Sequence, residues 1–176
     1  MSNIWHDISP KRISKDKFMA VIEIPKGCKN KYEMDKETGL LKLDRVLYTS
    51  THYPANYGFI PRTYAEDLDP LDVLVLCQET IVPMTLVECF PIGALKMIDN
   101  DEIDEKIIAV PINDPAYRCY TDISQLPQHI FNEISHFFKV YKILEGKETV
   151  VNEFVSAEEA KLIIEKCINL YKDNYC

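Results

Sequence analysis

Three aspartates stand close together, at positions 67, 69 and 72, directly before the apolar run of residues 73–76. Carboxylates this close repel one another, and burial beside a strand makes that repulsion more unfavourable. Carboxylate oxygens are hard ligands that suit magnesium, manganese or calcium ions. The segment therefore indicates a cation site, and the competing interpretation is a solvated acidic turn.

The backbone of this segment is expected to be extended. Asp67 and Asp69 are two residues apart, so an extended chain would point both carboxylates to the same side. Pro70 disfavours a helical conformation at Asp69, which supports that picture. Asp72 is then expected to open the following buried strand.

A second acidic cluster occupies residues 99–106, again between an apolar run and a predicted strand. Taken alone, such a loop is most simply solvated surface, and neither cluster has the glycine at the sixth position that an EF-hand loop requires. Two acidic loops at strand ends could, however, converge at the mouth of one barrel. Several divalent cations held there would polarise phosphoryl groups and generate hydroxide from bound water.

No glycine-rich loop is available to bind phosphate. The chain has five glycines and neither of the motifs G-x-x-x-x-G-K and G-x-G-x-x-G, so side chains must hold any phosphate oxygens. Twenty Lys and Arg residues against 28 Asp and Glu residues give a formal net charge of −8. This balance argues against an OB-type nucleic-acid binder, which needs a basic, aromatic-lined face.

Apolar and β-branched runs predict strands in the first two thirds of the chain. The expected strands are residues 18–25, 31–35, 40–48, 72–77, 85–97 and 105–111. A turn at residues 36–39 makes a hairpin of the second and third strands. The fifth segment, residues 85–97, is expected to form one strand or two, with a bend near Pro91 and Gly93.

The last third of the chain has helical periodicity. Apolar residues recur at steps of three and four over residues 126–146, where Pro127 suits the first turn and Gly146 the end. A second amphipathic helix, at the C-terminus over residues 156–171, begins with the capping pair Ser156 and Glu159. Strands followed by helices predict an α+β fold, most simply a small β-barrel with flanking helices, in one domain of residues 1–176.

The composition is that of a soluble globular protein, with 47% hydrophobic and 27% charged residues. No run approaches ~20 apolar residues and no secretory signal stands at the N-terminus, so no membrane contact is expected. The six cysteines form no C-x-x-C pair. The simplest interpretation is a cytoplasmic protein with reduced thiols, in which Cys77 is buried and Cys176 exposed, and disulfides are the alternative.

Several blocks of the sequence resemble one known family. The segment DLDPLDVLV resembles the D-x-D-P-x-D segment of the soluble family I inorganic pyrophosphatases of bacterial type. VIEIPKGCKNKYEMDKETG is similar to the N-terminal strand and hairpin of that family, LDRVL to its arginine strand, YPANYGFIP to its tyrosine-rich loop, and HFFKVYK to its late helix. The blocks follow the family order over most of the chain.

The resemblance implies hydrolysis of pyrophosphate to two phosphates, without a covalent intermediate, on an OB-like five-stranded β-barrel with flanking helices. Asp69 and Lys106 match the catalytic positions, with Asp69 as the group that orients the attacking water or accepts its proton. The positions of the metal ligands match Asp67, Asp72, Asp99 and Asp104. The positions that hold phosphate match Lys31, Arg45, Tyr57, Tyr141 and Lys142. The supporting positions match Glu23, Glu33 and Tyr53.

The same resemblance implies several magnesium ions per site, with manganese or zinc as substitutes and calcium as an inhibitor. It implies a homo-oligomer, by analogy a hexamer, in which the position of His136 lies at a subunit contact. Residues 99–104 depart from the family pattern because they contain no glycine, and VNEF replaces a Gly-Trp pair near the C-terminal helix. A non-catalytic module that binds divalent cations or phosphate remains the alternative hypothesis.

Overall fold

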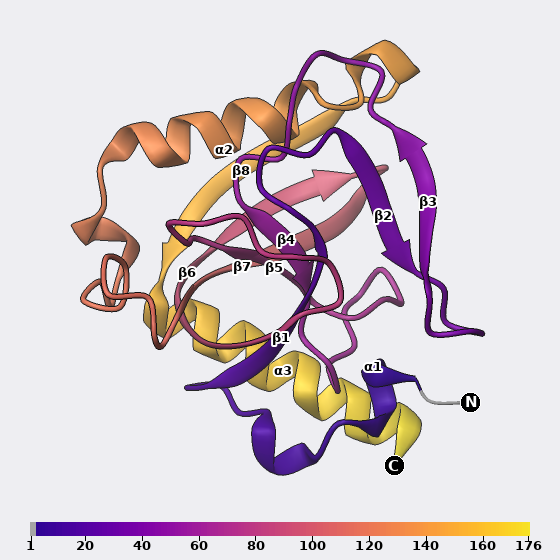
Figure 1. The fold of residues 1–176 in the computed structure, drawn as a ribbon, viewed down its shortest axis with the longest axis vertical. Helices are drawn as coiled ribbons and strands as arrows, with labels where there is room; N and C mark the ends of the chain where they lie inside the picture. Colours follow the sequence, from indigo (N-terminus) through magenta and orange to yellow (C-terminus); the bar gives the residue numbers. More distant parts are fainter. Residues whose placement is uncertain (1–2) are drawn as a thin grey trace.

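The computed structural model describes residues 3–176, which form a β-barrel with helices packed on its outside (Figure 1). The strands are β1 (Phe18–Ile24), β2 (Asn30–Met34), β3 (Leu41–Val46), β4 (Asn56–Phe59), β5 (Asp72–Val75), β6 (Leu86–Asp99), β7 (Glu102–Pro111) and β8 (Thr149–Ser156). The α-helices are α1 (Ile4–Asp7), α2 (Gln128–Val140) and α3 (Ala157–Tyr175). Three short 3₁₀ turns lie at Pro10–Arg12, Ile123–Gln125 and Ile143–Glu145.

Five strands close into the barrel in the order β1-β4-β5-β7-β6, with β6 pairing back onto β1. Only the β5–β7 pair of this ring is parallel. The long strand β6 pairs with β7 along one edge, and this register shifts between Pro91 and Gly93. Two strands share its other edge. The part before the shift pairs with β1 and the part after it pairs with β8. The predicted five-stranded OB-like barrel and the predicted bend are confirmed.

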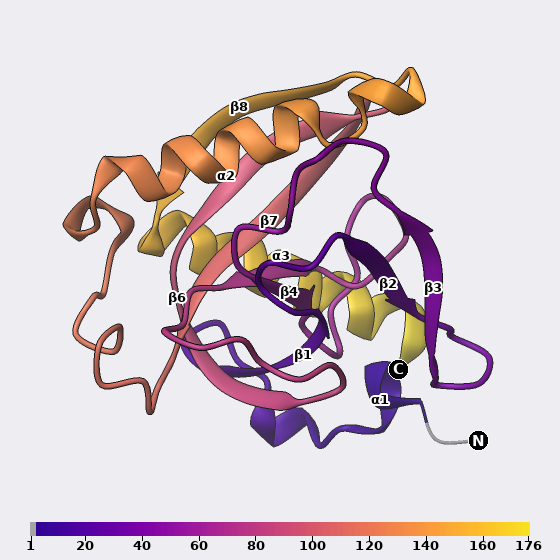
Figure 2. The ribbon, with the colours of Figure 1, turned by 45° about the horizontal axis from the view of Figure 1, so that its top comes forward.

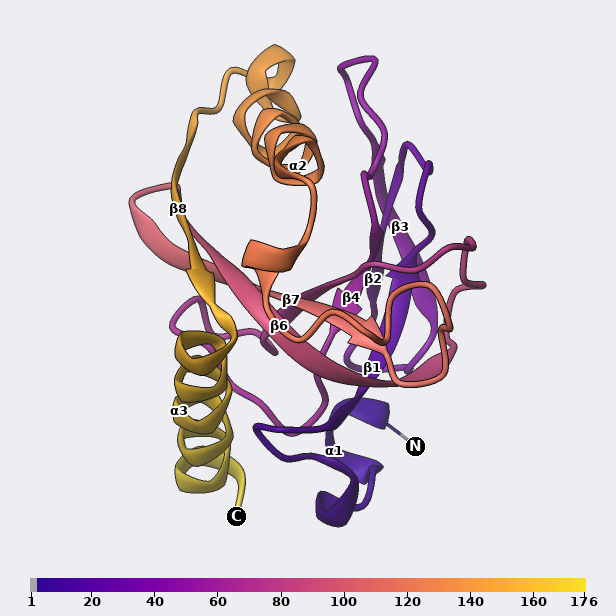
Figure 3. The same cartoon turned by 90° about the vertical axis from the view of Figure 1, so that its left-hand side faces the viewer.

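Both faces of the central strands are buried, which explains their continuous apolar runs. Val73 and Val75 pack in the cluster that includes α3, whereas Leu74 packs in the cluster that includes α2. Successive side chains of a strand point to opposite faces, so each face of β5 meets a different helix. Figure 3 shows α2 and α3 on different sides of the sheet. Packing on both of its faces thereby holds β5 in place.

The two predicted helices are present. Helix α2 is shorter than predicted and ends at Val140, because a 3₁₀ turn follows before Gly146 adopts a left-handed conformation with φ 72°. Helix α3 begins as predicted, with the Ser156 hydroxyl accepting a hydrogen bond from the Glu159 N–H at 3.3 Å. Among the described residues, no helix is both long and apolar enough to cross a membrane.

The predicted hairpin is also present, as a separate two-stranded sheet of β2 and β3 that stands beside the barrel (Figure 2). Its turn closes as expected, since the Gly39 N–H donates to the Asp35 carbonyl at 2.8 Å. Two strands, β4 and β8, were not predicted from the sequence. The six cysteines are free, and Cys176 is exposed as predicted, but Cys77 is only half-buried rather than buried.

The acidic segment after β6 is not the loop that the sequence suggested. Asn100 and Asp101, with φ 50° and 65°, form a two-residue turn between the paired residues Asp99 and Glu102. Asn and Asp tolerate this left-handed conformation better than most other residues, which explains why no glycine is needed there. Strand β7 therefore starts at Glu102 rather than at residue 105, and Asp104 lies within it.

Gly58 marks the tightest approach of two strands. A Cβ atom at this position would lie 1.8 Å from the Val21 carbonyl oxygen on β1. We expect Gly58→Ala to lower the free energy of unfolding by about 3 kcal/mol or more, because backbone must move. Gly146→Ala is the control. No atom lies within 4 Å of the Cβ that this substitution adds, so only the left-handed backbone disfavours it. We expect it to lower the free energy of unfolding by about 1–2 kcal/mol. Urea unfolding measures both, and equal losses would contradict the prediction.

Candidate active site

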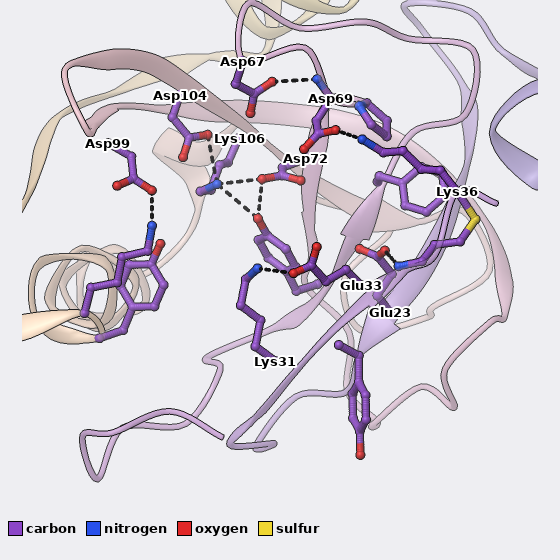
Figure 4. A pocket seen from close by; sticks show the side chains of 17 residues that line it. Glu23, Lys31, Glu33, Lys36, Asp67, Asp69, Asp72, Asp99, Asp104 and Lys106 are labelled. Atoms are coloured by element: carbon purple, nitrogen blue, oxygen red, sulfur yellow. Dashed lines mark hydrogen bonds and ion pairs between the residues drawn. The ribbon is translucent and has the colours of Figure 1, made fainter. Parts of the chain in front are cut away.

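A pocket of about 260 Å³ opens at the barrel rim, between the β2–β3 hairpin, the start of β5, the β6–β7 end and the end of α2 (Figure 4). Charged side chains dominate its wall. It is lined by Glu23, Lys31, Tyr32, Glu33, Met34, Lys36, Tyr57, Phe59, Asp67, Asp69, Pro70, Asp72, Asp99, Asp104, Lys106, Tyr141 and Lys142. All predicted site residues except Arg45 and Tyr53 are thus brought together.

Asp67 and Asp69 lie on a tight turn, so the predicted extended segment is wrong. Leu68 between them has a left-handed φ of 68°, and the Ala65 N–H donates to the Asp69 carbonyl at 2.8 Å. The Asp69 N–H in turn donates to Oδ1 of Asp67 at 3.2 Å. Both carboxylates still face the pocket. Asp72 opens β5 as predicted.

Lys106 is the buried centre of the site, with 2% of its surface exposed. Its ammonium group donates to Oδ2 of Asp72 at 2.7 Å, to Oδ1 of Asp104 at 3.0 Å and to the Tyr57 hydroxyl at 3.1 Å. The geometry follows from the sheet, because Asp72 pairs with Lys106 across β5 and β7, and Asp104 shares the face of Lys106. Lys106 is therefore held by two carboxylates and one phenol.

The charge state of this cluster follows from its partners. Burial lowers the pKa of Lys106, but the carboxylates of Asp104 and Asp72 outweigh it and hold the pKa well above its usual value. Burial, together with the charge of Asp72, raises the pKa of Asp67 to about 6. One fixed ammonium group thus leaves the carboxylates with excess negative charge, which favours the entry of further cations.

The other wall of the pocket combines Asp99 at the end of β6 with Tyr141 and Lys142 directly after α2. The Lys142 ammonium forms an ion pair with Oδ2 of Asp99. Oδ1 of Asp99 is buried and has no hydrogen-bond partner among the residues that the structure describes. Burial raises the pKa of Tyr141, so its phenol stays neutral and able to donate.

The hairpin contributes charged groups from the opposite side. The Lys31 ammonium lies 3.3 Å from Oε1 of Glu33 and 3.5 Å from Oδ2 of Asp44. Glu23 on β1 is buried, and its Oε1 accepts a hydrogen bond from the Met34 N–H at 2.7 Å. Burial raises the pKa of Glu23 to about 8, against this hydrogen bond. Glu23 therefore ties the hairpin to the barrel.

We expect Glu23→Gln to flatten the pH dependence of stability between about pH 4.5 and 8. In this window the folded protein keeps a proton on Glu23 that the unfolded chain has lost, so the free energy of unfolding falls as the pH rises. Glutamine cannot titrate and removes this slope. Urea unfolding with a chelator at several pH values measures it, beside the exposed turn variant Glu37→Gln. If the free energy of unfolding of Glu23→Gln fell with pH as steeply as that of the wild type, the expectation would be wrong.

Two predicted residues lie outside the pocket lining. Arg45 is turned to other carboxylates, with an ion pair to Asp44 and its Nε 2.8 Å from Oε1 of Glu145. Tyr53 is buried behind the site, and its ring centroid lies 5.2 Å from that of Tyr57. Tyr53 thus supports the ring that contacts Lys106.

Sequence reasoning missed one cation of the pocket, Lys36. It lies in the hairpin turn and forms an ion pair with Asp69, 33 residues further along the chain. A turn lysine has no periodic pattern that distinguishes it from a solvated one. The remaining unpredicted lining residues are uncharged: Tyr32, Met34, Phe59 and Pro70.

The donor set fits a hard divalent cation such as magnesium. Within residues 3–176, no three carboxylate, imidazole or thiol groups stand close enough together to hold a metal ion as they are arranged here. Lys106 and Lys142 instead occupy the places between the carboxylates. The excess of carboxylate oxygens and the unpartnered Oδ1 of Asp99 suit the oxygen ligation of a hard divalent cation.

The fold and the pocket together describe a small OB-like barrel whose rim carries an acidic pocket that also contains four lysines. The sequence profile described as inorganic pyrophosphatase matches residues 20–172. The chain is 52% identical to soluble inorganic pyrophosphatase 2 of Chlamydomonas reinhardtii, over 99% of this chain and 91% of that protein. It is 49% identical to soluble inorganic pyrophosphatase 1 of Arabidopsis thaliana, over 96% of this chain and 80% of that protein.

Solved structures agree with this assignment. The inorganic pyrophosphatase of Helicobacter pylori superposes with a TM-score of 0.90 at 41% identity, covering 94% of this chain and 99% of that chain. That of Thermus thermophilus gives a TM-score of 0.89 at 39% identity, covering 97% and 99%. The chain belongs to the inorganic pyrophosphatase family.

Proposed function

We propose that this pocket hydrolyses inorganic pyrophosphate to two phosphates by direct attack of water, without a covalent intermediate. The observation that carries the proposal is the gathering of five aspartates and four lysines at one barrel rim in a chain of this family. Phosphoryl transfer needs mainly positioning and charge neutralisation, and both kinds of charge are present. The relatives described above are named for catalysis, so nothing favours the alternative of a non-catalytic binding module.

Magnesium is the proposed cofactor, several ions per site, with manganese or zinc as substitutes. Asp67, Asp72 and Asp104 would hold the tightest ion, with Asp99 and Asp104 for an ion that arrives with the substrate. When bound, magnesium neutralises phosphate oxygens and lowers the pKa of coordinated water. Asp72, Asp99 and Asp104 lie on the barrel strands β5, β6 and β7, which fix their positions, and Asp67 lies on the turn before β5.

We assign Asp69 as the group that accepts the proton of the attacking water. Its carboxylate faces the pocket beside Asp67 and is about half exposed, so water reaches it. A positioned carboxylate that accepts a proton typically contributes a factor of about 10²–10⁴ to the rate. Lys106 remains protonated between Asp72 and Asp104 and keeps these two ligands in place.

We assign side chains on both walls of the pocket as the groups that bind the phosphate oxygens. Lys31 and Lys142 supply charge, while Tyr141 donates a hydroxyl hydrogen bond without adding charge. Tyr57 would do the same only after its hydroxyl, which donates to Oδ2 of Asp72 in the structure, leaves that carboxylate. Arg45 would join them only after leaving Asp44 and Glu145, since its present contacts point elsewhere. The supporting roles fall to Glu33 beside Lys31, and to Glu23 and Tyr53 behind the site.

We expect phosphate release from pyrophosphate to depend strictly on a divalent cation, in the first place magnesium. Removing divalent ions with a chelator should abolish release, and magnesium should restore it. Calcium should inhibit, because its ligand distances of about 2.3–2.6 Å are looser than the 2.0–2.1 Å of magnesium and misplace the water. Colorimetric phosphate measurement tests this. Magnesium binding without release would favour the non-catalytic module instead.

We further propose that the chain acts in the cytoplasm, as a single domain of residues 1–176 in a homo-oligomer, by family analogy a hexamer. Six free cysteines suit a reducing compartment. His136 lies in a surface groove with His52 and His129, outside the active-site pocket. Light scattering coupled to size exclusion measures the subunit number, and a monomeric mass would reject the hexamer.

A further inference from the structure

Lys36 has no role in the assignments made so far, although its ammonium group faces the pocket. It pairs with Oδ1 of Asp69, the carboxylate assigned to accept the proton of water (Figure 4). The side chains are 49% and 53% exposed. Such half-exposed pairs are weak and exchange easily with solvent or another anion. Lys36 therefore brings a movable positive charge to Asp69.

The backbone of Lys36 is anchored while its side chain is not. The Asn3 side-chain amide donates to the Lys36 carbonyl at 3.0 Å. The Lys36 ammonium also lies 5.3 Å from the centroid of the Trp5 ring, within cation–π range. Trp5 is itself buried, and its Nε1 donates to the Thr63 carbonyl at 2.9 Å. The hairpin turn is thereby held beside the pocket by the N-terminal segment.

The Trp5 ring is fixed by other aromatic rings. Its helix α1 lies beside the end of α3 (Figures 1 and 2). The centroid of the Trp5 ring lies 5.3 Å from that of Tyr175 and 6.2 Å from that of Tyr64. Because the chain contains a single tryptophan, selectively excited tryptophan emission reports on this position alone. The ring is a stationary partner against which movement of the Lys36 ammonium can be detected.

The remaining pocket lysines show the same arrangement. Lys142 pairs with Asp99, and Lys31 lies near Glu33, so each ammonium group rests on a carboxylate of the wall. A phosphate oxygen accepts stronger, charge-assisted hydrogen bonds from ammonium groups that are free to reach it. The Lys36 side chain is exposed and its backbone is anchored, so its ammonium group can exchange the Asp69 carboxylate for a phosphate oxygen.

We propose that Lys36 is a further phosphate-binding residue, which pairs with Asp69 in the free pocket and moves to an anionic oxygen of pyrophosphate when the substrate binds. The inference rests on the proposed function, because it assigns Lys36 to the same substrate. The movement releases the Asp69 carboxylate to accept the proton of the attacking water. Substrate binding thereby prepares Asp69 for the reaction. A purely structural Lys36–Asp69 pair would not respond to the ligand.

The test compares the wild type with Lys36→Gln, Lys36→Arg and the control Lys42→Gln. Lys42 lies on the same hairpin and does not line the pocket. The probe is methylenediphosphonate with magnesium, an analogue that cannot be hydrolysed because carbon replaces the bridging oxygen. Calorimetry gives its dissociation constant, and Trp5 emission is followed in the same titration. Steady-state kinetics with pyrophosphate give KM and kcat, and thermal melting confirms that each variant is folded.

The proposal predicts that Lys36→Gln weakens analogue binding about tenfold, the effect of one charge-assisted hydrogen bond, and raises KM more than it lowers kcat. Lys36→Arg should restore most of the affinity, and Lys42→Gln should match the wild type. Trp5 emission should change with the analogue in the wild type and not in Lys36→Gln. Wild-type affinity, KM and emission response in Lys36→Gln would overturn the role of Lys36 alone. A wild type that neither binds the analogue nor hydrolyses pyrophosphate would overturn the proposed function as well.

Discussion

Lys106→Met is expected to lower the free energy of unfolding by about 3–5 kcal/mol when magnesium is absent. The substitution removes the ammonium group that lies 2.7 Å from Asp72 and 3.0 Å from Asp104, and leaves these carboxylates without their shared cation. Methionine has a similar length, so the loss is one of charge rather than of packing. Added magnesium should restore much of the stability, because a cation then takes the place of the ammonium group.

Urea unfolding with chelator and with magnesium separates these contributions. Lys139→Met on the exposed face of α2 is the matched control and should change stability little in either condition. Phosphate release should fall strongly in Lys106→Met at any magnesium concentration, since the ligands lose their fixed spacing. If Lys106→Met were as stable as the wild type in chelator, the account of the buried cluster would be wrong.

Asp69→Asn is expected to lower kcat by about 10²–10⁴, because an amide cannot accept the proton of the attacking water. The change keeps the shape of the side chain, and its backbone contact with Asp67 is retained. Binding of magnesium should therefore change little, and melting temperature should stay close to that of the wild type. This separation of binding from turnover is the mark of a group that acts in the chemical step.

Asp101→Asn is the control for this variant, since it makes the same chemical change in the turn after β6 and Asp101 does not line the pocket. Asparagine also accepts the left-handed backbone of that turn. Its kcat should equal that of the wild type. Should Asp69→Asn keep more than a tenth of wild-type kcat, another group must receive the proton.

The barrel was predictable because its central strands are apolar on both faces. Runs such as residues 72–77 leave few alternatives to a buried strand, and the bend at Pro91 and Gly93 follows from backbone chemistry. Strand β4 was missed because it is short and is centred on Gly58, which disfavours a strand unless a neighbour approaches closely. Strand β8 was missed because its burial depends on β6, far away in the sequence.

The members of the site were predictable, but their arrangement was not. Family motifs identify the carboxylates, yet the turn at Leu68 places a left-handed conformation on a residue that disfavours it, stabilised by the hydrogen bond between Ala65 and Asp69. The position of Arg45 depends on Glu145, one hundred residues away. Lys36 likewise reaches Asp69 only because the hairpin folds over the pocket. Long-range contacts of this kind leave no local pattern.

The most direct test of the proposed metal and phosphate sites is a crystal structure with manganese and phosphate, in which anomalous scattering locates the metal ions. We expect manganese at the carboxylates of Asp67, Asp72 and Asp104, and phosphate beside Lys31 and Lys142. Manganese absent from this pocket, or bound only at the histidine groove of His52, His129 and His136, would contradict it.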